Sequence, residues 1–296
     1  MLIMDSSVKQ NDRLWVFIAS VFILSWVIWV PIVLLQDLAV VQSIGPLVFL
    51  VGVMSPSLLG IVFSYLSGGS SETKALLKRG VKGFKIVWLA AALVLLPVVA
   101  IGALGVAAVL TGSMNLVVDI PQGLMAFVMF PIILLMGGAL FEEFGWRGFA
   151  LDRLQSRWSA VVSSLILGII WGVWHLPMFF LVGSSQNILL AYLPISTVLF
   201  FIEAILVTFV ITWVYNNTGR SILGALLIHT TWNVTFSSFF FGVLTGFATD
   251  PTTLAGNIAV INMMELANIV FALLLAVVCV ILVVKWGKDL GKTQET

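Results

Sequence analysis

The stretch that decides the fold is Val87–Leu110, VWLAAALVLLPVVAIGALGVAAVL, in which 24 consecutive residues include no charged side chain. A helix of about 20 apolar residues is long enough to cross the hydrocarbon core of a bilayer. The rest of the chain is similar, because 61% of its 296 residues are apolar and 9% are charged. Since a soluble domain is about 25% charged, the sequence predicts an all-α integral membrane protein.

Eight stretches of the chain are apolar enough, and long enough or nearly so, to cross a membrane as helices. They are Leu14–Leu35, Val41–Leu66, Val87–Leu110, Leu124–Phe149, Ala160–Val182, Leu193–Val214, Leu223–Leu244 and Met263–Val284. The first stretch is longer than the apolar region of a signal peptide and is expected to be retained as an anchor. Because no internal repeat or long linker divides the chain, residues 1–296 are predicted to form one domain of about eight spans.

The basic residues indicate the orientation, because Lys and Arg are in excess in cytoplasmic loops. With eight spans and a cytoplasmic N-terminus, all fourteen fall on the cytoplasmic side. They are Lys9 and Arg13 before the first span, Lys74, Lys78, Arg79, Lys82 and Lys85 after the second, Arg147, Arg153 and Arg157 at or after the end of the fourth, Arg220 after the sixth, and Lys285, Lys288 and Lys292 after the eighth. We therefore expect a multi-pass protein of the cytoplasmic membrane with both termini in the cytoplasm.

The segment between the second and third spans, residues 72–85, is too polar to cross the membrane. Its apolar side chains recur at helical spacing beside five Lys and Arg residues, which predicts an interfacial amphipathic helix resting on anionic lipid headgroups. A solvated charged loop is the alternative. The net charge of +1 argues against nucleic acid as a partner, and the single cysteine, Cys279, excludes an intrachain disulfide.

Ionisable side chains within spans are costly and usually have a function or a partner. The predicted spans contain seven, namely Glu142, Glu143, Arg147, His175, Glu203, His229 and Glu265, and these include both histidines of the chain. Glu203 is expected to bond to neighbouring hydroxyls as a protonated acid, and Glu265 is expected near the outer interface. Neither is given a role.

The first motif is Phe141-Glu142-Glu143-Phe144-Gly145-Trp146-Arg147-Gly148. On a helix Glu143 and Arg147 are four residues apart and can form an ion pair. Glu142 projects about 100° away from Glu143, so it would stay available as a base. The alternative is a charged cap at the end of the span, with the Arg147 side chain extending to water.

Two further motifs each carry a histidine. In Trp171-Gly172-Val173-Trp174-His175-Leu176-Pro177, the Trp171 side chain lies one turn before His175 and can pack against its ring. In His229-Thr230-Thr231-Trp232-Asn233, the imidazole and the carboxamide share one helix face. Taken singly, His175 is as well explained by a bond to a backbone carbonyl, and His229 with Asn233 by interhelical hydrogen bonding.

Together the three motifs provide a carboxylate base, two imidazoles and an amide, which are the groups needed to add water to a carbonyl. A serine nucleophile is not indicated, since the chain has no G-x-S-x-G elbow before a helix, and it has no H-E-x-x-H zinc motif. For vertical helices, with about 1.5 Å rise per residue, Glu142 would lie roughly 10 Å and His175 about 22 Å from the cytoplasmic ends of their spans. We therefore expect the fifth span to start deeper, to tilt steeply, or to follow a connection that dips into the membrane.

With these residues the sequence resembles the CPBP or Abi family of intramembrane proteases, which includes type II CAAX-prenyl endopeptidases and bacteriocin-processing or immunity proteins. The family pattern is E-E-x-x-x-R, then an aromatic-x-x-x-His, then His-x-x-x-Asn or Asp. Here it is met by Glu142-Glu143 with Arg147, by Trp171 with His175, where Trp replaces the more frequent Phe, and by His229 with Asn233. The resemblance covers about residues 124–244.

The resemblance implies that Glu142 and His175 activate the attacking water and that His229 and Asn233 stabilise the oxyanion. Glu143, Arg147 and Trp171 would then support these four. It also implies an enzyme that needs no tightly held metal, while Glu142, His175 and His229 are kept as an alternative zinc set, since two His and a Glu can bind zinc.

The leading hypothesis is an intramembrane endopeptidase acting on a membrane-associated peptide that enters from the cytoplasmic half, with a prenylated CAAX-type peptide as one option. A non-catalytic membrane scaffold or bacteriocin self-immunity protein is the first alternative. A small transporter with a proton relay is the second, although it would be expected to have inverted repeats, and each motif here occurs once.

Overall fold

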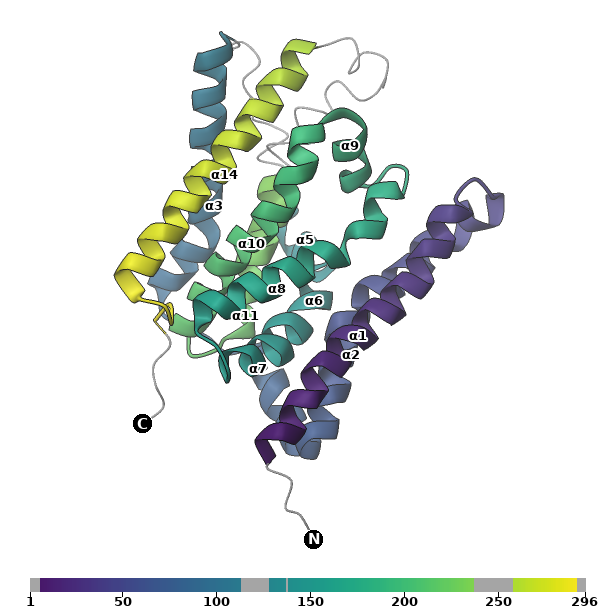
Figure 1. Cartoon of the computed structure of the whole chain (residues 1–296), viewed down its shortest axis with the longest axis vertical. Helices are drawn as coiled ribbons and strands as arrows, with labels where there is room; N and C mark the ends of the chain where they lie inside the picture. The colour runs from purple at the N-terminus through teal and green to yellow at the C-terminus, as the bar shows by residue number, and fades with distance from the viewer. Residues whose placement is uncertain (1–5, 113–127, 137, 237–257, 292–296) are drawn as a thin grey trace.

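The computed structural model describes residues 6–112, 128–136, 138–236 and 258–291 (Figure 1). Every secondary-structure element within these ranges is a helix. The long ones are α1 (Ser6–Leu34), α2 (Ala39–Arg79), α3 (Ile86–Thr111), α8 (Ala160–Trp174), α10 (Pro194–Asn217), α11 (Ile222–Thr235) and α14 (Ile258–Trp286). The short ones are α5 (Phe130–Met136), α6 (Ala139–Gly145), the π-helical turn η2 (Trp146–Leu151), α7 (Asp152–Gln155), the 3₁₀ turn η3 (Leu176–Phe180) and α9 (Ser185–Tyr192).

Six of the described helical stretches are long and apolar enough to cross a membrane. They are Arg13–Leu34, Ala39–Arg79, Ile86–Thr111, Ala160–Phe180, Pro194–Asn217 and Ile261–Trp286. The predicted all-α polytopic fold is therefore confirmed, and the chain is a multi-pass membrane protein. Two of the eight expected spans are not described as one continuous helix. The fourth is broken into short elements, and the seventh is described only as far as residue 236. Residues 124–127 and 237–244 of those two spans lie outside the described residues, as do the expected connections at 113–123 and 245–257.

The helices pack as a bundle with two outer pairs (Figure 1). Helices α1 and α2 pack together on one side, and α3 packs against α14 on the other. Helices α8, α10 and α11 lie between these pairs, and α10 contacts α8, α11 and α14. The short elements α6 and η2 pack against α2. Glu142 and Glu143, which lie on α6, are therefore inside the bundle.

The fourth expected span is interrupted at Gly138, which has a φ of 96°. This left-handed backbone conformation strains residues with a side chain and is accessible to glycine. Helix α5 therefore ends at Met136 and α6 begins at Ala139. The interruption puts Glu142 in the first turn of a new helix.

Helix α8 begins at Ala160, where the Ser159 hydroxyl accepts a hydrogen bond from the Val162 amide. The expectation of a deeper start is thus wrong. Figure 1 shows α8 running obliquely across the direction of α3 and α14. Among the expected alternatives for the fifth span, the structure therefore shows the steep tilt. The tilt keeps the C-terminal end of α8, with His175, near the middle of the bundle rather than at its far side.

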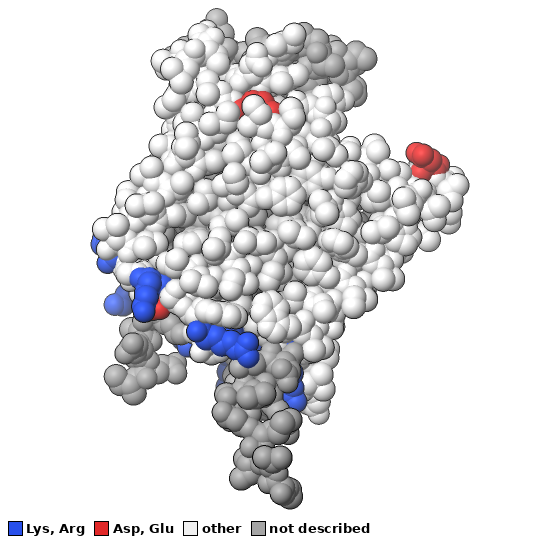
Figure 2. Space-filling view, viewed as in Figure 1, with Lys and Arg blue, Asp and Glu red and all other residues white. Residues whose placement is uncertain are grey.

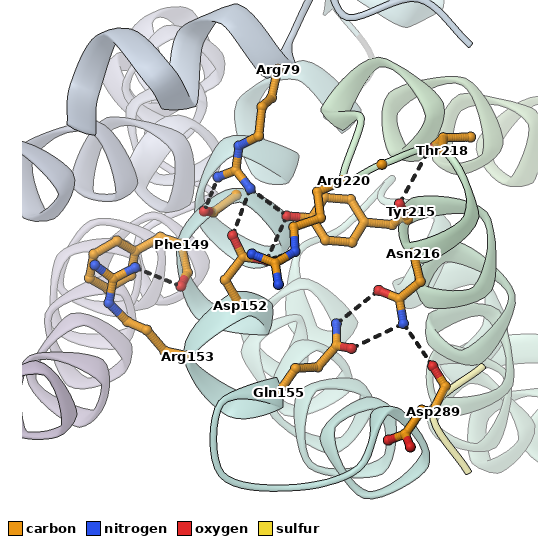
Figure 3. A network of polar contacts seen from close by, with 12 residues as sticks. Arg79, Phe149, Asp152, Arg153, Gln155, Tyr215, Asn216, Thr218, Arg220 and Asp289 are labelled. Carbon is orange, nitrogen blue, oxygen red and sulfur yellow. Dashed lines mark hydrogen bonds and ion pairs between the residues drawn. The ribbon is translucent and has the colours of Figure 1, made fainter. Parts of the chain in front are cut away.

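The basic end of the molecule is held by a polar network that joins three parts of the chain (Figure 3). Arg79 Nη1 donates to Asp152 Oδ2 at 2.6 Å and to the Tyr215 hydroxyl at 2.7 Å, and that hydroxyl donates to Asp152 Oδ1 at 2.8 Å. Beside it, the side-chain amides of Gln155 and Asn216 bond to each other. The tail of α2, α7 and the end of α10 are therefore fixed to one another.

The predicted helix at 72–85 is present as far as Arg79, after a break in α2 at Gly68 and Gly69. The alternative prediction of a solvated loop is therefore wrong for residues 72–79, and residues 80–85 form the non-helical connection to α3. Leu76 is buried and Leu77 is 45% exposed, so one side of this helix packs against the bundle. Its contact with lipid headgroups stays a prediction.

Candidate active site

Five of the seven candidate residues lie on the wall of one cavity of about 920 Å³, and Glu143 and Arg147 do not. Its lining includes Glu142 from α6, Trp171 and His175 from the end of α8, and His229 and Asn233 from α11. The structure thus brings together residues that are up to 91 positions apart in the chain. The volume is within the range of about 300–1,000 Å³ that is usual for ligand sites.

Glu142 is buried, with 4% of its surface exposed, and its carboxylate has one short hydrogen bond. The Trp171 indole Nε1 donates to Glu142 Oε2 at 2.6 Å. We predicted Trp171 to pack against His175, and the two rings do lie edge to face with centroids 5.5 Å apart. The bond to Glu142 was missed, because nothing in the sequence shows which helix faces the indole nitrogen.

Glu143 bonds to two other candidate residues. Its Oε1 accepts from Arg147 Nη1 at 2.6 Å, which confirms the ion pair predicted from their spacing. The same oxygen lies 2.7 Å from His229 Nδ1. Arg147 is fully buried, also donates to the Thr208 hydroxyl at 3.3 Å, and lies 5.2 Å from the Trp171 ring centroid. One buried acid therefore fixes both an arginine and an imidazole.

The hydrogen bonds of the two histidines restrict their tautomers. His175 Nδ1 lies 2.7 Å from the Trp171 carbonyl oxygen, which can only accept, so Nδ1 carries the proton. In a neutral His175 ring, Nε2 is then left with a free lone pair. The acceptor for His229 Nδ1 is the Glu143 carboxylate. By the same argument, Nε2 of His229 is available for a hydrogen bond to another group.

The chain leaves little room around Glu142 on either side. A Cβ on Gly138 would lie 3.0 Å from Glu142 Oε1, and Gly138 is also the residue with positive φ. One turn after Glu142, a Cβ on Gly145 would lie 2.1 Å from the Pro56 carbonyl oxygen of α2. Small residues let α6 approach α2 closely, as is common for helices in membranes, and this contact holds the acid in place.

The two remaining intramembrane acids are buried outside this cavity lining. Glu203 is fully buried, and neither carboxyl oxygen has a hydrogen-bond partner, so the expected bonds to hydroxyls are not present. Glu265 accepts from the backbone amides of Ile195 and Ser196 at 2.9 and 2.8 Å, and from the Ser196 hydroxyl. It thus caps the N-terminus of α10, whose first amides lack partners within the helix.

The alternative zinc set receives no support from the geometry. Among the described residues, no group of three or more His, Cys, Asp or Glu side chains is placed to hold a metal ion. Glu142 is engaged by an indole N–H, and His175 and His229 each use Nδ1 for a carbonyl and a carboxylate.

The lining of the cavity also includes residues outside the three motifs. Among them are Asp37, which is exposed and lies between α1 and α2, and Ser185 and Gln186 at the start of α9. Figure 2 shows that the Lys and Arg side chains of this face gather at one end of the molecule. The expected entry of a peptide from the cytoplasmic half of the membrane stays a prediction. The side chains of Trp146 and Phe149, which follow Glu142 in the chain, are fully buried.

Comparison with known proteins supports the motif-based resemblance. The family model described as type II CAAX prenyl endopeptidase Rce1-like matches residues 121–235. The chain is also 27% identical over 229 residues to CAAX prenyl protease 2 of Methanococcus maripaludis, which covers 76% of this chain and 84% of that relative. The predicted resemblance is therefore confirmed, and it supports endopeptidase activity within a membrane.

Proposed function

Since residues 121–235 match the Rce1-like endopeptidase family, we propose that the chain is an intramembrane endopeptidase in which Glu142 activates water for attack on a peptide carbonyl. The observation that carries the proposal is the hydrogen bond of 2.6 Å from Trp171 to Glu142 Oε2. It holds one carboxylate oxygen while Glu142 lines a cavity that also has both imidazoles on its wall. A base that is fixed and faces a cavity is what general-base catalysis requires.

In this mechanism Glu142 accepts a proton from the attacking water and later passes it to the leaving amine. His175 can accept a hydrogen bond from the same water through Nε2, because its Nδ1 proton is bonded to the Trp171 carbonyl. Two acceptors would then orient the lone pairs of the water toward the substrate carbonyl.

The oxyanion formed by the attack needs hydrogen-bond donors that are in place beforehand. We assign this role to His229 and Asn233, which lie one turn apart on α11 and both line the cavity. The Glu143 carboxylate bonded to His229 Nδ1 fixes the orientation of the ring, and Nε2–H of His229 is the donor to the oxyanion. Arg147 completes this group by neutralising Glu143.

The assigned steps need no cofactor, since the base, the proton carrier and the donors are all side chains of this chain. The substrate is a membrane-associated peptide. A prenylated CAAX-type peptide is one candidate, because the Methanococcus maripaludis relative is called a CAAX prenyl protease.

The proposal is tested by quantitative proteomics of cells that carry the wild type or Glu142→Gln at equal expression. We expect uncleaved precursors to accumulate with Glu142→Gln. The matched control is Glu203→Gln, which makes the same chemical change at a fully buried acid that is not on the cavity wall, and it should leave the precursors unchanged. A phenotype that survives Glu142→Gln with no change in any precursor would favour the scaffold or immunity alternative.

A further inference from the structure

We propose that Thr208, on α10, is a positioning residue that fixes the Arg147 guanidinium and thereby the orientation of His229 toward the oxyanion. The inference deepens the proposed function and rests on it, because it concerns how the oxyanion donor of the same site is held in place. Thr208 belongs to none of the three motifs, and it does not line the cavity. It therefore acts through other side chains and not by contact with the substrate.

The hydroxyl of Thr208 is the second point at which the guanidinium of Arg147 is held. Arg147 is fully buried, and it donates from Nη1 to Glu143 Oε1 at 2.6 Å and from Nη2 to Thr208 Oγ1 at 3.3 Å. Among the described residues, Arg147 Nε has no hydrogen-bond partner. Because a guanidinium is a planar group with its donors in a fixed fork, one bond leaves the plane free to turn and a second bond fixes it.

The local backbone explains why Arg147 needs a contact outside its own segment. Glu143 lies in α6, whereas Arg147 lies in the π-helical turn η2 that follows. The hydrogen bonds of a π-helical turn join residues five apart, so the alignment of residues four apart on an α-helix does not continue through it. The position of the Arg147 side chain therefore also depends on another helix, and α10 provides the contact through Thr208.

Glu143 transmits the position of Arg147 to His229. Its Oε1 accepts from Arg147 Nη1 and also lies 2.7 Å from His229 Nδ1. Its Oε2 has no partner in the part of the chain that the structure describes. Because a single oxygen has both bonds, a displaced guanidinium turns the carboxylate and, with it, the imidazole. The side chain that donates to the oxyanion in the proposed mechanism is thus anchored on α10.

Arg147 also contacts the residue that holds the base. Its guanidinium carbon lies 5.2 Å from the centroid of the Trp171 ring, which is within the distance of about 6 Å over which a cation and an aromatic face attract each other. The same indole donates to Glu142 Oε2 and packs edge to face against His229, with ring centroids 5.0 Å apart. One fixed guanidinium therefore supports both the base and the oxyanion donor.

The proposal is tested with Thr208→Val, which keeps the shape of the side chain and removes its hydroxyl. The matched control is Thr212→Val, because Thr212 is also fully buried on α10, one turn later, and its hydroxyl has no partner among the described residues. In steady-state cleavage of a precursor that accumulates with Glu142→Gln, we expect Thr208→Val to lower kcat about tenfold, the effect of losing one weak bond to a charged group. KM should change little, since Thr208 does not line the cavity.

Thr208→Ser, which restores the hydroxyl, and Thr212→Val should both cleave at the wild-type rate. Equal losses of kcat in Thr208→Val and Thr212→Val would overturn the proposal. A Thr208→Val protein with a wild-type kcat, or with a change in KM alone, would overturn it as well. If Thr208→Val does not fold, Thr208→Ala and Thr212→Ala replace the pair and are compared in the same way.

A second measurement does not depend on cleavage. The chain has two histidines, so isotopic labelling of the histidine ring nitrogens gives two sets of imidazole NMR signals, which His175→Gln assigns. We expect Thr208→Val to shift the signals of His229 and Thr212→Val to leave them in place, and unshifted signals in Thr208→Val would overturn the proposal. If Glu142→Gln cleaves as fast as the wild type, the proposed function fails, whereas the His229 signals still report whether Thr208 holds this group.

Discussion

The hydrogen bond between Trp171 and Glu142 makes a sharp prediction for Trp171→Phe. The substitution removes the indole N–H that lies 2.6 Å from Glu142 Oε2 but keeps an aromatic ring beside His175 and His229. A hydrogen bond to a charged group contributes about 1.5–3 kcal/mol. Because each 1.36 kcal/mol is tenfold in rate, kcat should fall about 10- to 150-fold if the bond is needed to orient the base in the transition state.

The assay is steady-state cleavage, in proteoliposomes, of a precursor identified by the proteomic comparison. We expect kcat to fall with KM little changed, because the lost bond orients the acid and does not hold the substrate. The matched control is Trp174→Phe, which removes a bond from Nε1 to the neutral Ser25 hydroxyl, 2.9 Å long, outside the cavity lining. Equal losses of kcat in the two variants would refute the reasoning, since the orientation of Glu142 would then not depend on Trp171.

Three further substitutions test separate parts of the account. Asn233→Ala should lower kcat about 10²–10³-fold if it donates to the oxyanion, and an unchanged kcat in the same assay would remove that role. Gly145→Ala places a methyl group 2.1 Å from the Pro56 carbonyl oxygen and should destabilise the protein by about 1–3 kcal/mol; an unchanged melting temperature in detergent would mean that α2 and α6 can separate at little cost. Glu203→Met replaces a buried carboxyl without a partner. It should raise the free energy of unfolding by the ~1–3 kcal/mol that such a group costs, and with it the melting temperature. A lower melting temperature would show that the acid is bonded in the folded protein.

The features that the sequence predicted correctly depend on short-range geometry. The ion pair of Glu143 with Arg147 follows from their spacing of four on a helix, and the packing of Trp171 against His175 follows from the same rule. The apolar runs likewise report helices one at a time, so the all-α polytopic fold could be predicted from composition and run length alone.

The features that could not be predicted from the sequence depend on contacts between helices or on a single backbone angle. A hydropathy pattern continues through Gly138, so it did not reveal the break between α5 and α6; the glycine pair before Ala139 was the available signal. The tilt of α8 is set by its neighbours and was only one of three predicted alternatives. The bonds from Trp171 to Glu142 and from His229 to Glu143 join residues on different helices, and spacing along the chain carries no information about them.

The central claim is that Glu142 acts as the base that activates water, and the single-turnover cleavage rate of purified Glu142→Gln tests it most directly. Our account predicts a rate about 10²–10⁴-fold below that of the wild type, the usual contribution of general-base catalysis, with a melting temperature that is not reduced. A folded Glu142→Gln protein that cleaves the same precursor at the wild-type rate would contradict it.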